Sequence, residues 1–244
     1  MAELLADTLT RFALFAGLDA HTRRQIARDA HKRTYQAGQV IILAGEPTRA
    51  VYLVLDGEVR IERSSLEGRE YVLHSLGPGQ CFNLASALDG GFNLATVRAS
   101  TQAITYVLPV DVFRRIVGEH PDLSLVLLQY MAGRVRGLCD TVEDLALHTV
   151  RTRLARCLLS YTNGRVPARV TNSRVPASRY MTQGEMAAHI GTVRDVVGRT
   201  LRVFSKEGLI RRERGRVVIT DLPGLRREAL CDEAADVLAC RRMN

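Results

Sequence analysis

The sequence predicts an α+β fold: an antiparallel, jelly-roll-like β-roll, then one long helix, then a C-terminal winged helix-turn-helix. Three observations support this prediction. Short runs rich in Val, Ile, Leu and Tyr alternate with glycines over residues 35–82. A heptad pattern occupies residues 128–145, and two short helical patterns meet at a glycine within residues 182–204. We expect domains at residues 1–120, 121–148 and 149–244.

Composition indicates a globular protein. The 244 residues are 46% hydrophobic, which suits a buried core and excludes a disordered chain. No apolar run reaches the roughly 18 residues that cross a bilayer, and the N-terminus lacks the regions of a signal peptide. We therefore expect a cytoplasmic protein without membrane association. The five scattered cysteines form neither a disulfide framework nor a zinc site, so plain thiols are expected, with a redox role as the alternative.

Charge is distributed unevenly along the chain. Residues 1–149 carry 15 basic and 17 acidic residues, a net charge of −2. Residues 150–244 carry 19 basic and 9 acidic residues, a net charge of +10. The basic back half predicts a polyanionic partner, and a merely solvated basic face is the alternative.

The front half changes periodicity at Tyr35. Residues 2–33 are predicted to be helical with a turn near Gly17, because apolar residues recur at helical spacing. Residues 35–82 are predicted to be short strands of a sandwich or barrel, and residues 95–109 add two more. A short helix is expected over Asp111–Glu119, which Pro121 ends or restarts.

A long helix is predicted from about Leu123 to Leu147. Six apolar residues occupy successive a and d positions of its heptads: Leu128, Met131, Val135, Leu138, Val142 and Leu145. Such a seam is typical of a coiled coil and favours a parallel homodimer. The alternative is a single helix that packs on its own β-roll.

Residues 182–204 predict a helix-turn-helix. Thr182 and Glu185 form a capping-box pattern, and Gly191 can adopt the positive φ that ends a helix. We expect Thr192 and Asp195 to cap the second helix in the same way. Its inward face is predicted from the apolar side chains Val193, Val196, Val197, Leu201 and Phe204. Its outward face keeps the polar side chains Arg194, Asp195, Arg199 and Arg202, as in a helix that enters the DNA major groove.

The segments around this motif complete a winged domain. Residues 151–161 are predicted to be a helix, and the two RVPA copies within residues 163–181 predict extended segments. Residues 209–220 predict a hairpin that turns at Gly215 and places arginines on DNA phosphates. These are Arg211, Arg212, Arg214 and Arg216. A terminal helix is expected over residues 225–243, without an assigned role.

This order of elements resembles the CRP/FNR family of bacterial transcription regulators. The resemblance extends from Leu14 to about Asp221. In the front half it rests on Leu14-Phe15-Ala16-Gly17-Leu18, on Gly45-Glu46 and on the YLVLDGEVRI segment at 52–61. In the back half it rests on the pattern TQxEMAxxIGTxRxxVxRxL. The resemblance implies a homodimer that binds a two-fold site in double-stranded DNA and recruits or blocks RNA polymerase.

The resemblance also implies roles for individual residues. Arg194, Asp195 and Arg199 occupy the positions of the family's R-E-x-x-x-R motif, whose polar members contact base edges. Asp195 is one methylene shorter than the usual Glu, so it contacts a base, caps the helix or orients Arg199. The implied phosphate contacts are Thr182, Gln183 and Thr192, and Arg202 joins the DNA-facing set.

The implied effector pocket departs from the cyclic-nucleotide pattern. Within the segment beginning Phe82-Asn83, Leu84 replaces the Glu that holds the ribose, and Asn93, beside Leu94, replaces the Arg that holds the cyclic phosphate. On the long helix Arg134 is kept, but Leu138-Cys139 replaces a Thr-Ser pair. Without the cation a cyclic phosphate has no charge partner. We therefore predict that this protein does not bind cyclic AMP tightly.

Other effectors stay open. An iron–sulfur cluster is not expected, because residues 1–80 contain no cysteine. Haem could use His74, Cys81 or His120 as an axial ligand, although none of them lies in a specific pattern. An apolar pocket is predicted from Phe82, Leu84, Leu88, Phe92, Leu94 and Leu138, either for an uncharged ligand or filled by its own side chains.

The sequence thus favours a sequence-specific DNA-binding regulator over two other classes. One is a nucleoid-type binder with little sequence preference, which the polar pattern at 194–202 disfavours. The other is an enzyme, for which no nucleophile motif, P-loop or metal spacing is present.

Overall fold

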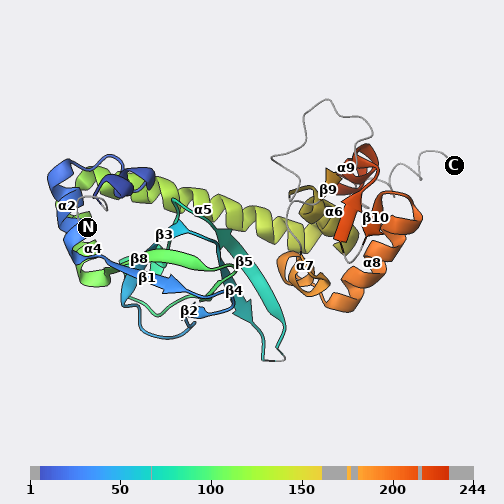
Figure 1. The fold of residues 1–244 in the computed structure, drawn as a ribbon, viewed down its shortest axis with the longest axis horizontal. Helices are drawn as coiled ribbons and strands as arrows, with labels where there is room; N and C mark the ends of the chain where they lie inside the picture. Colours follow the sequence, from blue (N-terminus) through green and yellow to red (C-terminus); the bar gives the residue numbers. More distant parts are fainter. Residues whose placement is uncertain (1–5, 67, 161–174, 177–180, 214–215, 231–244) are drawn as a thin grey trace. The chain divides into compact units, whose positions relative to one another are not determined.

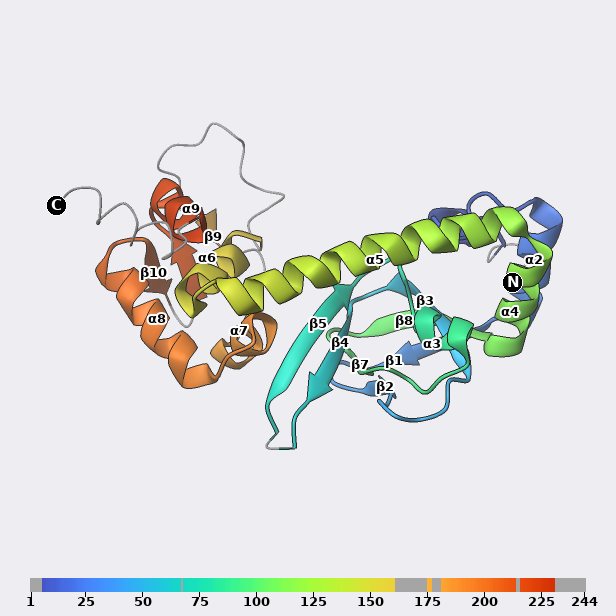
Figure 2. The ribbon, with the colours of Figure 1, turned by 180° about the vertical axis from the view of Figure 1, so that it is seen from behind.

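The computed structural model describes residues 6–66, 68–160, 175–176, 181–213 and 216–230. The chain divides into two compact units, residues 1–63 with 72–137 and residues 64–71 with 138–244. Figures 1 and 2 show the predicted α+β class: strands and one long helix are followed along the chain by a C-terminal unit of helices and short strands. In the described part of the chain no helix is long and apolar enough to cross a membrane. The boundaries expected after residues 120 and 148 remain predictions.

Two four-stranded sheets form the β-roll. One has the strand order β1 (His31–Tyr35), β8 (Ala103–Pro109), β3 (Ala50–Asp56), β6 (Cys81–Phe82). The other has the order β2 (Val40–Ile42), β7 (Thr96–Ala99), β4 (Val59–Ser64), β5 (Glu70–Leu76). The pairs β1–β8, β3–β8 and β4–β7 are antiparallel. Buried apolar side chains from both sheets, among them Val54 and Val97, form one core cluster.

Glycine is required at the turn between β3 and β4. Gly57 has φ +76°, and a Cβ placed there would lie 2.0 Å from the carbonyl oxygen of Gln102. Any other residue would have to shift the backbone of the facing loop, so the close approach of this turn to Gln102 requires glycine.

The prediction of helix throughout residues 2–33 is wrong in its extent. A 3₁₀ helix, η1, covers Leu9–Arg11, helix α2 covers Ala20–Asp29, and the next segment is strand β1. Asp19 is the N-cap residue of α2, and its Oδ1 accepts a hydrogen bond of 2.9 Å from the Thr22 backbone N–H. Hydrogen bonds from Thr22 lower the pKa of Asp19 to about 2. Phe12 and Phe15 lie in turns that bury them in the core instead of continuing a helix.

The short helices α2, α3 and α4 of the first unit each contact strand β3 or strand β8. Helix α4 (Val110–Glu119) matches the predicted short helix, and Pro121 begins the next helix. In both Figure 1 and Figure 2, α2 and α4 lie beside the N-terminal end of α5. Helix α3 (Leu84–Asp89) was not predicted, because six residues are too few to show helical periodicity.

Helix α5 (Pro121–Leu147) confirms the predicted long helix and presents two apolar faces. Leu123 and Leu127 are buried in the core of the first unit, and Met131 is partly buried there. The other five seam residues are exposed, at 67% for Leu128 and 63% for Val142. One face therefore packs on the chain's own β-roll, whereas most of the seam is exposed in a single chain.

The second unit contains the predicted winged helix-turn-helix. Its elements are α6 (Val150–Ser160), β9 (Val175–Pro176), α7 (Gln183–Ile190), α8 (Arg194–Lys206), β10 (Ile210–Glu213), β11 (Arg216–Ile219) and α9 (Leu222–Leu230). Strand β11 pairs antiparallel with both β10 and β9. The hairpin turn at Gly215, most of the RVPA segment and residues 231–243 of the expected terminal helix lie outside the described residues.

Candidate nucleic-acid interface

Helix α7 begins at the predicted capping box. The Glu185 backbone N–H donates to Thr182 Oγ1 at 3.2 Å, and the Thr182 backbone N–H donates to Glu185 Oε2 at 2.7 Å. These reciprocal bonds satisfy two backbone donors that a helix start leaves unpaired. Gly191 ends α7 with φ +65°, as predicted. The first residues of α7 are thus fixed in place.

The side-chain cap that the sequence predicts for the second helix is not present in the structure. Helix α8 has Val193 at its N-cap position, where the structure gives no side-chain cap hydrogen bond. Thr192 precedes this position by one residue, and its backbone N–H donates to the Ala187 carbonyl at 3.0 Å in the turn that ends α7. Val193 is 41% exposed instead of facing the core. Asp195 lies in the first turn, where its charge suits the helix dipole.

The two faces of α8 differ sharply. Val197, Leu201 and Phe204 are buried in the core of the second unit. The predicted DNA-facing residues are all exposed: Arg194, Asp195, Arg199 and Arg202. With Gln183 and Gly198 they line one hollow of about 600 Å³. The structure therefore brings three of its arginines and Gln183 together on one surface.

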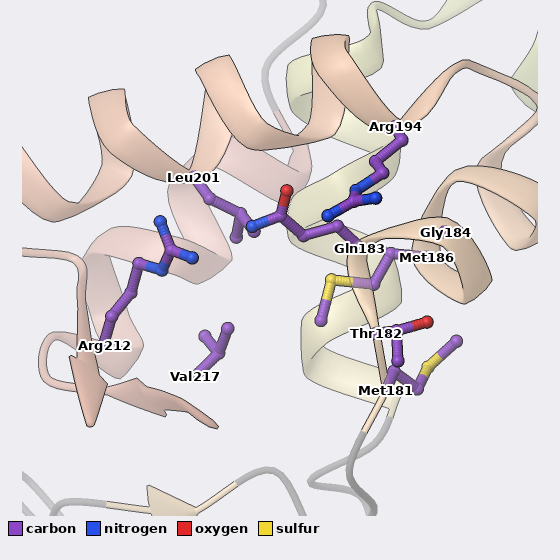
Figure 3. A pocket seen from close by; sticks show the side chains of 9 residues that line it. All are labelled: Met181, Thr182, Gln183, Gly184, Met186, Arg194, Leu201, Arg212 and Val217. Carbon is purple, nitrogen blue, oxygen red and sulfur yellow. The ribbon is translucent and has the colours of Figure 1, made fainter. Parts of the chain in front are cut away.

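A second hollow lies between the helix-turn-helix and the wing. It has a volume of about 450 Å³, and Arg194, Gln183 and Arg212 of β10 are among its lining residues. Figure 3 shows the Gln183 amide between the guanidinium groups of Arg194 and Arg212, with Met186, Leu201 and Val217 as apolar neighbours. Arg211, also on β10, forms an ion pair with Glu213. Arg214 and the side chain of Arg216 lie outside the described part.

Arg151, for which the sequence predicts no role, connects α6 to α8 and α9 through ion pairs. Arg151 of α6 contacts Glu207, the C-cap residue of α8, with Nη2 to Oε2 at 2.6 Å. Its Nε lies 2.5 Å from Glu228 Oε2 on α9, and its guanidinium lies 5.0 Å from the Phe204 ring centroid. Hydrogen bonding to Arg151 lowers the pKa of Glu228. The partners are 56 and 77 residues away in sequence, so no local pattern indicates them.

The position expected to hold a cyclic phosphate contains a closed amide network. Asn93 is 5% exposed, and its Oδ1 accepts hydrogen bonds of 3.0 Å from Thr48 Oγ1 and Asn83 Nδ2. Its Nδ2 donates to the Leu43 carbonyl at 3.0 Å. Asn83, with φ +67°, also donates to the Ala50 carbonyl at 3.0 Å. Both functional groups of Asn93 are therefore engaged within the protein.

The structure does not bring the predicted apolar pocket residues into one cavity wall. Phe82 stacks on Tyr52 in the core between the sheets, with ring centroids 4.7 Å apart. Leu84 belongs to a different core cluster, which also contains Leu123 and Leu127 of α5. Phe92 and Leu94 are 64% and 61% exposed. The remaining predicted residues are also spread out, with Leu88 exposed on α3, Arg134 partly buried, and Leu138 and Cys139 exposed on α5.

The haem-ligand candidates lie in separate places. Burial, together with nearby Arg134, lowers the pKa of His74, and burial raises the pKa of the Cys81 thiol to about 12. His120 Nε2 lies 3.3 Å from Thr22 Oγ1. Among the described residues, no group of three or more His, Cys, Asp and Glu side chains could hold a metal ion.

Comparison with known proteins places both units in one class. A cyclic nucleotide-binding domain model matches residues 32–120, and a Crp-like helix-turn-helix model matches residues 152–228. Together with the exposed polar face of α8, these matches define a DNA-binding transcription regulator with a cyclic-nucleotide-binding-type domain. The chain belongs to the CRP/FNR family.

Relatives extend over most of the chain. The transcriptional regulator SdrP of Thermus thermophilus is 30% identical over 197 residues, which are 79% of this chain and 91% of that protein. The CRP-like cAMP-activated global transcriptional regulator of Mycobacterium tuberculosis is 28% identical over 228 residues, 91% of this chain and 99% of that protein. A CRP/FNR regulator structure from Thermus thermophilus matches with TM-score 0.67 and 27% identity over 83% of this chain and all of that one.

The Arg151 contacts predict a modest, pH-dependent contribution to stability. Arg151→Met should lower the free energy of unfolding of the second unit by about 1 kcal/mol, since partly exposed ion pairs and one cation–π contact are lost. Glu228 has a lowered pKa, so its contribution is present above its ordinary value of 4.5 and is lost as the pH falls through the lowered value. Chemical unfolding at neutral pH and in acid should show the difference shrinking in acid.

Arg226→Met is the matched control, because Arg226 is exposed on the same helix as Glu228. It should unfold like the wild-type protein at both pH values. An Arg151→Met effect that is equal at neutral and acid pH would contradict the role of Glu228.

Proposed function

We propose that this protein acts as a homodimeric, sequence-specific regulator that responds to a signal other than cyclic AMP, or to none. The observation that carries the proposal is the exposed face of α8, where Arg194, Arg199 and Arg202 share one surface with Asp195 and Gln183. The opposite face is buried, so the polar side chains are held outward on a rigid helix. A helix of this kind enters the major groove.

Base contact is assigned to the first two turns of α8. The Arg194 and Arg199 guanidinium groups can each hold O6 and N7 of guanine, and Asp195 can accept from N4 of cytosine. Phosphate contact is assigned to residues around them: Thr182, Gln183, Thr192, Arg202, Arg212, Arg214 and Arg216. The arginines among these also supply the sequence-independent part of binding.

A parallel homodimer follows from the exposed seam of α5. Leu128, Val135, Leu138, Val142 and Leu145 repeat at heptad spacing and are 40–67% exposed in the single chain. A second copy would cover them, since identical seams are self-complementary about a two-fold axis. The dimer would present two α8 helices to half-sites about one DNA turn apart, roughly 34 Å. Bound there, it would recruit or block RNA polymerase.

Control by cyclic AMP is not part of the proposal, although the Mycobacterium tuberculosis relative is named as cAMP-activated. Leu84 is buried and apolar where that chemistry needs a ribose acceptor. Asn93 is neutral, and its amide is already engaged by Thr48, Asn83 and Leu43. An uncharged ligand or haem remains the alternative signal.

A nucleoid-type binder is the second candidate function. It is favoured by the net charge of +10 over residues 150–244, which would attract any DNA. The two candidates differ in how much base contact contributes to affinity.

Arg199→Ala separates these candidates. Loss of a bidentate guanine contact should weaken binding to a duplex selected from a random pool by about 1–3 kcal/mol, while binding to random duplex changes little. Gel-shift titration of both duplexes measures this, with Arg226→Ala as the exposed control outside the interface. Equal losses on both duplexes would make Arg199 a phosphate contact and favour the nucleoid-type function.

Val135→Lys tests the dimer. In a parallel pair the two lysines would face each other across the axis, so we expect monomers at micromolar concentration and loss of two-fold-site binding. Sedimentation velocity measures the oligomeric state. Gln129→Lys is the matched control, because Gln129 is exposed on α5 outside the seam. A wild-type protein that is monomeric at high concentration would contradict the proposed dimer.

Calorimetric titration tests the effector assignment. We expect no heat of cyclic AMP binding in the low-micromolar range, because the cyclic phosphate lacks a cationic partner at Asn93. The same preparation should bind its selected DNA, which shows that it is active. A dissociation constant for cyclic AMP of a few micromolar would refute the assignment.

A further inference from the structure

Gly198 lies in α8, the helix proposed to enter the major groove, and it is in close contact with the side chain of Gln183 from α7. Gly198 lies one turn after Arg194 on α8 and has an ordinary helical φ. A Cβ built on it would lie 3.0 Å from Gln183 Oε1 and 3.8 Å from Gln183 Cδ. Gln183 is the first residue of α7. The end of its side chain therefore packs against α8 at Gly198, where no α8 side chain is in the way.

The Gln183 amide has no hydrogen-bond partner among the described residues, although the side chain is partly buried. It lines both hollows of the interface, and Arg194 does so as well. Arg199 and Arg202 line one hollow, and Arg212 lines the other. Figure 3 shows the amide between Arg194 and Arg212. Its N–H groups thus lie in a surface where cations attract an anion.

We propose that Gly198 is a positioning residue that lets the Gln183 amide reach the DNA backbone and donate a hydrogen bond to a phosphate oxygen. The proposal rests on the function proposed above. A phosphate is the expected partner because the first helix of a helix-turn-helix crosses the backbone, and its N-terminal residues meet it there. Gln183 and Gly198 would then act as one unit.

Substitution at Gly198 separates folding from binding. Glycine is among the least favourable residues in a helix interior, so Gly198→Ala favours α8 itself. The atom that an added methyl group meets is the far end of a flexible side chain, so Gln183 can move while the helix stays in place. Stability and DNA affinity should therefore change in opposite directions, which damage to the fold would not produce.

The experiment compares Gly198→Ala, Gln183→Ala and the double variant by thermal melting and by titration of selected and random duplexes. Gly198→Ala should melt at or above the wild-type temperature and bind both duplexes about three- to tenfold more weakly, as for loss of one hydrogen bond. Gln183→Ala should show the same loss, and the double variant should lose no more than either single variant. Since a neutral amide displaces no counterion, the dependence of affinity on salt should be unchanged.

Gly118→Ala is the matched control, because Gly118 lies in α4 and an added Cβ there meets nothing within 4 Å. It should bind DNA normally. Additive losses in the double variant, or full binding by Gly198→Ala, would overturn the proposal. Weakened binding of the selected duplex alone would make Gln183 a base contact and overturn the phosphate assignment. Failure of the proposed function is seen separately, as a wild-type protein that does not discriminate the selected duplex.

Discussion

The buried face of α8 is the constraint on which the output end of this protein depends. Val197, Leu201 and Phe204 are almost completely buried, and they fix the rotation of the helix about its axis. That rotation decides which side chains remain outside. If the helix turned by one residue, about 100°, arginines would enter the core and the apolar side chains would face water. The positions of Arg194 and Arg199 are thus set by hydrophobic burial on the other side of the same helix.

The same logic separates what the sequence could predict from what it could not. Strands with glycine turns, the heptad pattern of α5 and the capping box at Thr182 are local patterns, and the structure contains them all. The N-terminal segment was mispredicted because Phe12 and Phe15 have helical spacing yet lie in turns. Strand β1 carries few apolar residues, and its partner β8 lies about 70 residues further along the chain.

At the candidate site, the sequence identified the exposed residues of α8 but not what holds them. The cap expected at Thr192 is absent from the structure, because α8 begins one residue later and has Val193 at its N-cap position. The Arg151 contacts and the Asn83–Asn93–Thr48 network join residues distant in sequence. Hydrogen-bond partners of this kind follow from tertiary packing, which periodicity does not encode. In the β-roll the sequence singled out Asn93 as a departure from the family pattern, and the structure shows its hydrogen-bond partners.

Helix α9 has a consequence for the order in which the domain can be completed during synthesis. Arg151 and Arg156 belong to α6, but Glu228 and the Ala229 carbonyl that they contact lie on α9. The ribosome therefore produces α6, α7 and α8 well before the partners that hold α6 against the last helix. A nascent chain that stops before residue 222 would leave Leu154 and Leu158 without their α9 neighbours. Packing of this unit is therefore complete only after α9 has been synthesised, whereas the last strand of the β-roll, β8, ends at Pro109.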